Sequence, residues 1–227
     1  MNASTLPQLD SASAIRWPRR WHLLVLCSLT SACLAVWCWP AAGGLWQLDR
    51  AAFFAGQWWR LQTGHLVHWS GDQLFWDLLV FVALSVLCAR RDPRRWLICL
   101  LTASVLIPLS IVVWQPAIQT YRGLSGLDTA LFALLATRLG RESWQQREWR
   151  RLAIVICFVA AFFAKTGYEL STGNTVFVHS HVANFVSLPL AHIAGALTGA
   201  LLGVAAGIGE RVVIAPECTG QREDRIG

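Results

Sequence analysis

The sequence predicts an all-α membrane protein, a bundle of six transmembrane helices with both termini in the cytoplasm. Of its 227 residues, 55% are hydrophobic and only 14% are charged, whereas about 25% are charged in an average soluble domain. The apolar residues gather in six segments, and the positive charges gather in alternate loops. One soluble core of this size could not hide so much apolar surface. The composition also excludes a disordered chain, a coiled coil and a small disulfide scaffold.

Six segments are each long and apolar enough to cross the hydrocarbon layer, which takes roughly 17–25 mostly apolar residues. The second and the fourth each contain one aspartate, and the fifth can be extended through Tyr168. The sixth lies within an uncharged run that ends at residue 209. The predicted spans are 21–40, 74–89, 96–114, 123–139, 152–164 and about 188–208.

The 19 arginine and lysine residues are divided unevenly between the two sides that six spans define. Three precede the first span, four follow the second, five lie around and after the end of the fourth, and three lie in the tail. Positive residues collect in cytoplasmic loops. The segment 1–20 and the tail 210–227 are therefore predicted to be cytoplasmic, on either side of a membrane domain at 21–209. Arginine-rich inner loops without an organelle signal indicate a bacterial inner membrane.

The loop between the first two spans, residues 43–73, is rich in aromatic residues. Aromatic rings favour the membrane interface, where the ring is half buried and its polar edge stays hydrated. We therefore expect this loop to lie partly in the outer headgroup layer. A plain aromatic belt with no other role would have the same composition.

Ser125 lies between glycines at the start of the fourth predicted span. The 17 residues of this span would rise about 25 Å as a helix, less than the hydrocarbon thickness, so the helix can begin below the outer surface. Free N–H groups at a helix N-terminus favour a developing oxyanion, which suits a nucleophilic serine that has a base nearby. A small-residue contact between membrane helices gives the same Gly-x-Ser-Gly pattern.

His192 is the candidate base for that serine. It lies near the outer end of the sixth span, about one turn before Gly195, and Gly199 and Gly203 continue the same helix face. Such a stripe of glycines allows close contact with a neighbouring helix. If the stripe packs against the Ser125 helix, the imidazole can reach the hydroxyl and act as a general base.

Three motifs lie in a six-span frame that covers about residues 21–209. They are Trp59-Arg60 with His65 and His68, the Gly-Leu-Ser-Gly run at 123–126, and the Ala-His-Ile-Ala-Gly run at 191–195. In this order and topology the chain resembles the rhomboid intramembrane serine proteases. The resemblance implies a six-helix rhomboid-like bundle and a Ser–His dyad without a third acid. Ser125 would be the nucleophile and His192 the base.

The resemblance also implies an oxyanion hole built from backbone N–H groups near the serine, at Leu124 and Gly126, and from polar side chains of the second span. The family pattern there is His-x-x-x-Asn, and this chain has Gln73 and Asp77 instead. The amide of Gln73 can donate a hydrogen bond, whereas Asp77 can do so only when protonated. Thr129 replaces a tyrosine common in the family. Asp128 is either an acid that orients His192 or a buried carboxylic acid satisfied within the bundle.

A narrower resemblance, to the rhombosortase branch, rests on two short segments. Lys165, Tyr168, Glu169 and Gly173 form a Lys-x-x-aromatic-Glu-x-x-x-Gly pattern, and Tyr121-Arg122 precede the serine motif. The branch is linked to proteins that carry a C-terminal Gly-Gly signal followed by a transmembrane helix and a basic end. Lys165 and Glu169 also have the i,i+4 spacing of a plain helical ion pair.

The sequence therefore predicts an endopeptidase that cleaves membrane-anchored proteins at the outer, periplasmic edge of the bilayer. Two rivals stay open: a catalytically inactive rhomboid-like binder of membrane helices, and a small transporter that uses Asp77 and Asp128 as an ion path. We expect no cofactor, no nucleic acid and no metal. Four outward histidines could form a metal site, but His65 and His68 are better explained as residues that order the aromatic loop.

Overall fold

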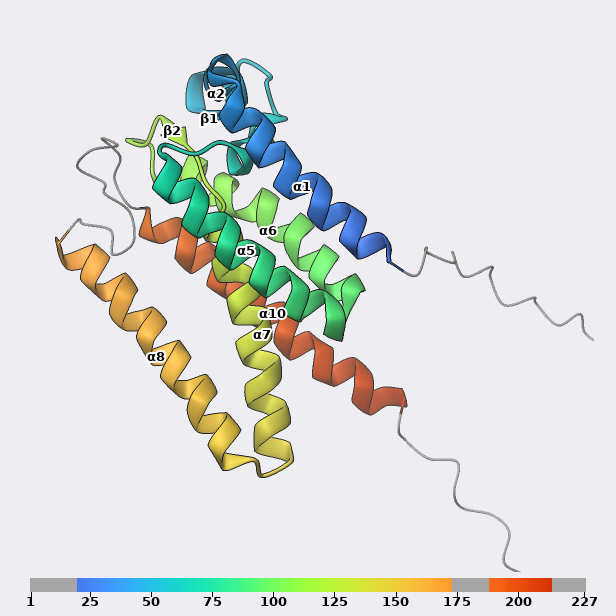
Figure 1. The fold of residues 1–227 in the computed structure, drawn as a ribbon. Helices are drawn as coiled ribbons and strands as arrows, with labels where there is room; N and C mark the ends of the chain where they lie inside the picture. Colours follow the sequence, from blue (N-terminus) through green and yellow to red (C-terminus); the bar gives the residue numbers. More distant parts are fainter. Residues whose placement is uncertain (1–19, 173–187, 214–227) are drawn as a thin grey trace, which may run out of the picture.

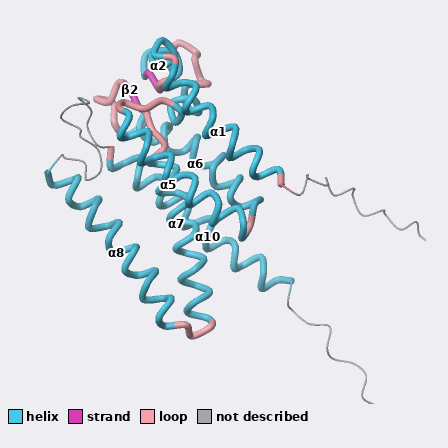
Figure 2. The backbone as a smooth tube through the Cα atoms, in the orientation of Figure 1, coloured by secondary structure: helices cyan, strands magenta, loops and turns pink. Residues whose placement is uncertain are grey.

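The computed structural model describes residues 20–172 and 188–213, and helices dominate these segments (Figure 1). The long helices are α1 (Trp21–Cys38), α5 (Gly71–Arg91), α6 (Pro93–Trp114), α7 (Ser125–Gln145), α8 (Trp149–Thr172) and α10 (Pro189–Val213). Each coincides with one of the six predicted spans. In Figure 2 short connections join α5 to α6 and α7 to α8.

Four of the long helices, α1, α5, α6 and α8, are long and apolar enough to cross a membrane by length and composition, and α10 contains a shorter apolar stretch, Pro189–Ala205. The fold is thus a mostly helical bundle with several candidate membrane spans. The remaining long helix, α7, is less apolar than the other five and is not a candidate span by length and composition, although the sequence predicts it to cross the membrane. Because α7 packs against α5, α6, α8 and α10, its polar residues lie against protein and need not face lipid.

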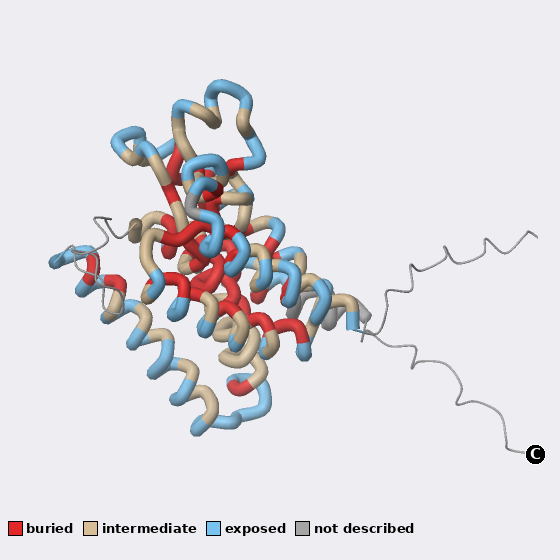
Figure 3. The backbone as a smooth tube through the Cα atoms, turned by 45° about the horizontal axis from the view of Figure 1, so that its top comes forward, coloured by how far each residue is buried: buried red, intermediate tan, exposed pale blue. Residues whose placement is uncertain are grey.

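The buried residues gather in the middle of the bundle (Figure 3). Helix α7 packs there against α5, α6, α8 and α10. Phe81 of α5, Ile107 of α6 and Leu131 of α7 are fully buried. Large apolar side chains on the outer faces are instead exposed, as at Leu24 (67%) and Phe158 (64%). Extended exposed apolar surface of this kind marks contact with another apolar phase, which fits a bundle surrounded by lipid.

The aromatic loop between α1 and α5 folds into short elements at one end of the bundle. They are α2 (Pro40–Trp46), β1 (Leu48–Asp49), α3 (Arg50–Phe54), α4 (Arg60–Thr63) and the 3₁₀ turn Gly64–Leu66. Strand β1 pairs antiparallel with β2 (Thr120–Tyr121), with Leu48 opposite Tyr121. This pairing ties the loop to the segment just before Ser125.

Arg60 holds the aromatic loop together from inside. Its guanidinium is buried and donates to the side-chain oxygen of Gln57 at 2.7 Å and to the carbonyls of Gly44 and Gln47 at 2.9 Å. A planar guanidinium can serve several fixed acceptors at once, which an ammonium group does less well. The loop is therefore an ordered platform, and its location in the headgroup layer stays a prediction.

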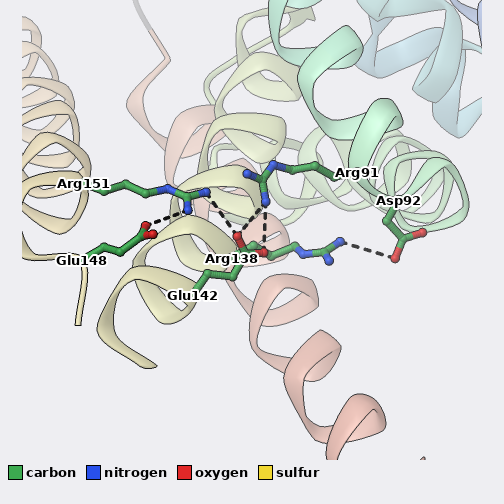
Figure 4. A network of polar contacts seen from close by, with 6 residues as sticks. All are labelled: Arg91, Asp92, Arg138, Glu142, Glu148 and Arg151. Atoms are coloured by element: carbon green, nitrogen blue, oxygen red, sulfur yellow. Dashed lines mark hydrogen bonds and ion pairs between the residues drawn. The ribbon is translucent and has the colours of Figure 1, made fainter. Parts of the chain in front are cut away.

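Ion pairs connect the helices at the opposite end, which the sequence predicts to be cytoplasmic (Figure 4). Arg91 and Arg151 both contact the carboxylate of Glu142, with N···O distances of 2.8 and 3.4 Å. Arg138 lies 3.4 Å from Asp92 in the connection between α5 and α6. These side chains are partly exposed, so each pair contributes about 1 kcal/mol or less, and the network mainly fixes how the helix ends meet.

Candidate active site

Ser125 is the first residue of α7, as the sequence predicts, and the turn before it has an unusual backbone. Gly123 has a φ of +117°, and a Cβ there would lie 2.6 Å from Nε2 of Gln73 and 3.2 Å from Oδ2 of Asp77. Only glycine combines this φ with such close neighbours. The turn therefore brings its backbone directly against the side chains of α5. The helix itself continues to Gln145, beyond the predicted end at residue 139, so α7 is longer than the sequence indicates.

The glycine stripe of α10 packs against α7, which confirms the prediction from the sequence. A Cβ at Gly195 would collide with the carbonyl of Gly126, and one at Gly199 would collide with the carbonyl of Ala130. The two backbones are therefore in contact, as small residues allow in membrane helix pairs.

This close packing brings the two predicted catalytic residues together. His192 lies one turn before Gly195, and its Nε2 is 3.3 Å from Oγ of Ser125. The imidazole is buried at 7% exposure, and Ser125 is half-buried. A hydroxyl within reach of a buried imidazole at a helix N-terminus is the arrangement that nucleophilic catalysis by serine requires.

The residues expected to support an oxyanion have distinct contacts. The side-chain oxygen of Gln73 accepts a hydrogen bond from the backbone N–H of Trp69 at 2.8 Å, which turns its amide nitrogen toward Gly123. Asp77 accepts from the backbone N–H of Leu124 at 3.1 Å, so this N–H is engaged with a carboxylate. Gly126 is buried in the first turn of α7, where backbone N–H groups have no intrahelical partner.

The sequence predicts that His65 and His68 order the aromatic loop, and in the structure both contact residues outside that loop. His65 is 1% exposed, and its two ring nitrogens lie 3.2 Å from the carbonyls of Gly123 and Ser104. Burial lowers the pKa of His65 to about 4, against the smaller raising effect of the two carbonyls. His68 lies with Nε2 3.5 Å from Asp77, beneath the same turn.

Tyr121 and Arg122 complete the support of this turn. The Tyr121 hydroxyl donates to the carbonyl of Gly123 at 3.1 Å, and burial raises the pKa of this phenol. Arg122 donates to Oε1 of Gln47 at 2.7 Å and lies over the ring of Trp69, 4.2 Å from its centroid. Partial burial lowers the pKa of this guanidinium, because desolvation disfavours its charged form. The sequence indicates no structural role for either residue, because the contacts join distant segments.

Asp128 shows neither of the two roles weighed for it. Asp128 is buried, but no ion pair joins it to His192 among the described residues, and its Oδ1 has no hydrogen-bond partner there. It is therefore neither paired with the imidazole nor fully satisfied within the described bundle. The hydroxyl of Thr129 donates to the carbonyl of Ser125 at 2.9 Å, within its own helix.

A carboxylate near His192 does exist, on α8. Oε2 of Glu169 lies 4.0 Å from Nδ1 of His192, and its Oε1 lies 2.8 Å from Nζ of Lys165. The i,i+4 spacing predicts the ion pair with Lys165 but does not predict the burial of Glu169, which is 3% exposed. A buried carboxylate in an apolar helix is costly. A glutamate near the end of such a helix was therefore the sequence feature that could have indicated a functional residue.

A cavity of about 610 Å³ lies beside this site, between α5, α7 and α8. Ser125, His192 and Glu169 line it together with Asp128, and apolar side chains such as Phe132 and Phe162 form much of the remaining wall. Its size lies within the range of substrate pockets. Among the described residues, no group of His, Cys, Asp or Glu side chains could hold a metal ion, and His179 and His181 lie outside those residues.

Comparison with known proteins assigns the chain to a family. The rhomboid domain family model matches residues 55–208, more than half of the chain, and the match includes α5 through α10. The chain belongs to the rhomboid family. It is thus a rhomboid-family intramembrane protease or a relative of one. No curated protein matches the chain.

Proposed function

We propose that this protein is an intramembrane serine endopeptidase, with Ser125 as nucleophile and His192 as general base. The observation that carries the proposal is the 3.3 Å distance between Oγ and Nε2, at a helix N-terminus that opens on a cavity. Rhomboid proteins act on membrane proteins, and the family match supports the same substrate class here. The site would face the periplasm from a bacterial inner membrane, because the arginine-rich loops lie at the other end.

The reaction runs through an acyl-enzyme. Oγ of Ser125 attacks the scissile carbonyl carbon while Nε2 of His192 takes the hydroxyl proton. The proton then passes to the leaving amine as the C–N bond breaks. A water molecule next gives a proton to His192 and attacks the acyl carbon. The bond from this carbon to Oγ then breaks, His192 returns the proton to Oγ, and the carboxylic acid leaves. An amine in place of that water would give a transpeptidation product from the same intermediate.

Gln73 and the first-turn N–H groups of α7 are the donors that we assign to the oxyanion. The Gln73 amide nitrogen is held toward Gly123 by the bond between its oxygen and Trp69, and the N–H of Gly126 belongs to the helix start. Asp77 has a different role in this assignment. By accepting the N–H of Leu124, it anchors the turn that presents Ser125 and does not itself donate to an oxyanion.

Rhombosortase-type processing of C-terminal Gly-Gly sorting signals is the substrate preference that we propose. It rests on the pattern formed by Lys165, Tyr168, Glu169 and Gly173. A fusion carrying Gly-Gly, a transmembrane helix and a basic end should be processed in cells, whereas the same fusion with both glycines changed to leucine should not. Equal processing of the two fusions would remove the branch assignment and leave the endopeptidase proposal standing.

A catalytically inactive, membrane-helix-binding relative is the second candidate. The replacement of the family residues by Gln73 and Asp77 favours it, as does the engagement of the Leu124 N–H with a carboxylate. A transporter has less support. An ion path through Asp77 and Asp128 gives no reason for Ser125 and His192 to lie within hydrogen-bond distance of each other.

Covalent labelling of the purified full-length protein by a fluorophosphonate probe tests the proposal. We expect the wild type to label, and Ser125→Ala and His192→Ala to lose labelling while keeping the wild-type unfolding temperature. Thr129→Ala, which removes a hydroxyl one turn away on the same helix, is the matched control and should still label. Wild-type labelling no greater than that of Ser125→Ala would favour the inactive binder.

A further inference from the structure

We propose that Glu169 is a positioning residue for His192, so that Ser125, His192 and Glu169 form a Ser–His–Glu relay. The inference rests on the proposed function and goes beyond the dyad without a third acid that the rhomboid resemblance implies. Its basis is the order of three side chains from three helices: Oγ of Ser125 on α7, the imidazole of His192 on α10, and the Glu169 carboxylate on α8.

The tautomer of His192 gives the physical reason for such a residue. To accept the Ser125 proton, Nε2 must be unprotonated, so the neutral ring must carry its proton on Nδ1. Nδ1 is buried and has no hydrogen-bond partner among the described residues. A buried N–H without an acceptor costs about 1–3 kcal/mol, which would favour the wrong tautomer unless an acceptor is close.

Glu169 places an acceptor on that side of the ring. Its Oε2 is 4.0 Å from Nδ1, about 1 Å longer than a hydrogen bond. Catalytic hydrogen bonds are often long before substrate binds and tighten afterwards, and a single water can also bridge this separation. When His192 takes the serine proton, the carboxylate lies next to the resulting imidazolium and stabilises it.

Lys165 orients the carboxylate. Its ammonium contacts Oε1 at 2.8 Å and leaves Oε2 on the side of His192. Lys165 is the only lysine in the chain and is about one-third exposed, whereas the Glu169 side chain is almost fully buried. A simple surface ion pair does not require one partner to be buried beside a histidine, so the pair alone does not explain the position of Glu169.

The test measures fluorophosphonate labelling in two parts, the maximal rate kinact and the half-saturating concentration KI. In Glu169→Gln we expect kinact to fall by about tenfold or more with KI unchanged, because the amide can donate to Nδ1 and favour the wrong tautomer. Glu169→Asp keeps a carboxylate and should recover part of the rate. Glu148→Gln, which changes an ion-paired glutamate at the other end of α8, should match the wild type.

Lys165→Gln separates the relay from the ion pair. If Glu169 matters only as the partner of Lys165, the two glutamine variants must lose kinact and thermal stability equally. If Glu169 acts on His192, Lys165→Gln should retain most of the rate. Equal losses in Lys165→Gln and Glu169→Gln would overturn the inference, as would a Glu169→Asp variant no faster than Glu169→Gln.

An NMR measurement tests the same contact without relying on catalysis. In protein labelled with ¹⁵N-histidine, the His192 signals are assigned by their loss in His192→Gln. We expect the Nδ1–H tautomer in the wild type and a shift toward the Nε2–H tautomer in Glu169→Gln. An Nε2–H tautomer in the wild type would overturn the inference. Failure of wild-type labelling together with an Nδ1–H tautomer would instead reject the protease proposal alone.

Discussion

Gly123→Ala should impair the active site more than its effect on stability explains. The new Cβ would lie 2.6 Å from Nε2 of Gln73, so the amide must retreat by about 0.8 Å to restore an ordinary contact of 3.4 Å. The Gln73 oxygen is bonded to the backbone of Trp69 at 2.8 Å, so the amide cannot retreat without weakening that bond. Alanine at a φ of +117° adds about 1–3 kcal/mol of backbone strain.

Two other glycines separate these contributions. Gly56 also has a positive φ, +95°, but has no atom within 4 Å of its Cβ position, so Gly56→Ala introduces strain without a collision. Gly44 has neither feature. Gly56→Ala should therefore lower the unfolding temperature and leave fluorophosphonate labelling unchanged, while Gly44→Ala should change neither.

The labelling rate gives the decisive comparison. Displacement of an oxyanion donor by close to 1 Å costs roughly 10–100-fold in rate, so Gly123→Ala should label at least tenfold more slowly than Gly56→Ala at equal folded concentration. Thermal unfolding in detergent gives the folded fraction of each variant. Equal labelling rates in the two strained variants would refute the assignment of Gln73 as a donor.

Three further predictions concern the supports of the site. The neutral His65 ring is buried with a pKa of about 4, while the unfolded residue titrates near 6.5. Between these values the unfolded state binds one more proton, so the free energy of unfolding decreases by about 3 kcal/mol as the pH is lowered from about 6.5 to about 4. His65→Gln should flatten the slope of unfolding temperature against pH. Arg60→Lys should lose about 2–4 kcal/mol of stability, because the compact ammonium cannot occupy the positions of the two guanidinium nitrogens that serve the three fixed acceptors, and an unchanged midpoint of chemical unfolding would contradict this. Gly199→Leu should abolish labelling by separating α10 from α7 at Ala130, whereas Gly167→Leu, with no atom within 4 Å of its Cβ position, should label normally.

The association of Ser125 with His192 was predictable because both residues have local signals. A glycine stripe on one helix and a Gly-x-Ser-Gly turn on another are visible in the sequence, and the stripe can satisfy its packing only against a close neighbour. The structure gives that neighbour as α7. His192 lies one turn before Gly195, so the sequence predicts its contact with Ser125 on the condition that the glycine stripe packs against the Ser125 helix, and the glycine contacts between α10 and α7 meet that condition.

Glu169 and Asp77 show where sequence reasoning ends. The spacing of Lys165 and Glu169 predicts their ion pair correctly but contains no information on which face of α8 meets α10. The function of Asp77 depends on whether its carboxylate faces an oxyanion or a backbone N–H, and that choice is made by the turn at Gly123, whose φ no local pattern specifies. The environment of Glu169 depends on the contact of α8 with α10, and that of Asp77 depends on the contact of α5 with the turn before α7.

The hydropathy of α7 links the fold to its chemistry. A helix that carries Ser125, Asp128 and Thr129 in its first two turns is too polar to face lipid at low cost, and α7 alone among the six predicted spans has neither the apolar length nor a shorter apolar stretch. Its neighbours α5, α6, α8 and α10 surround it and expose their own apolar side chains outward. The enclosing helices therefore carry the apolar excess of the chain. This arrangement allows the polar start of α7 to hold Ser125 against His192 beside the cavity of about 610 Å³.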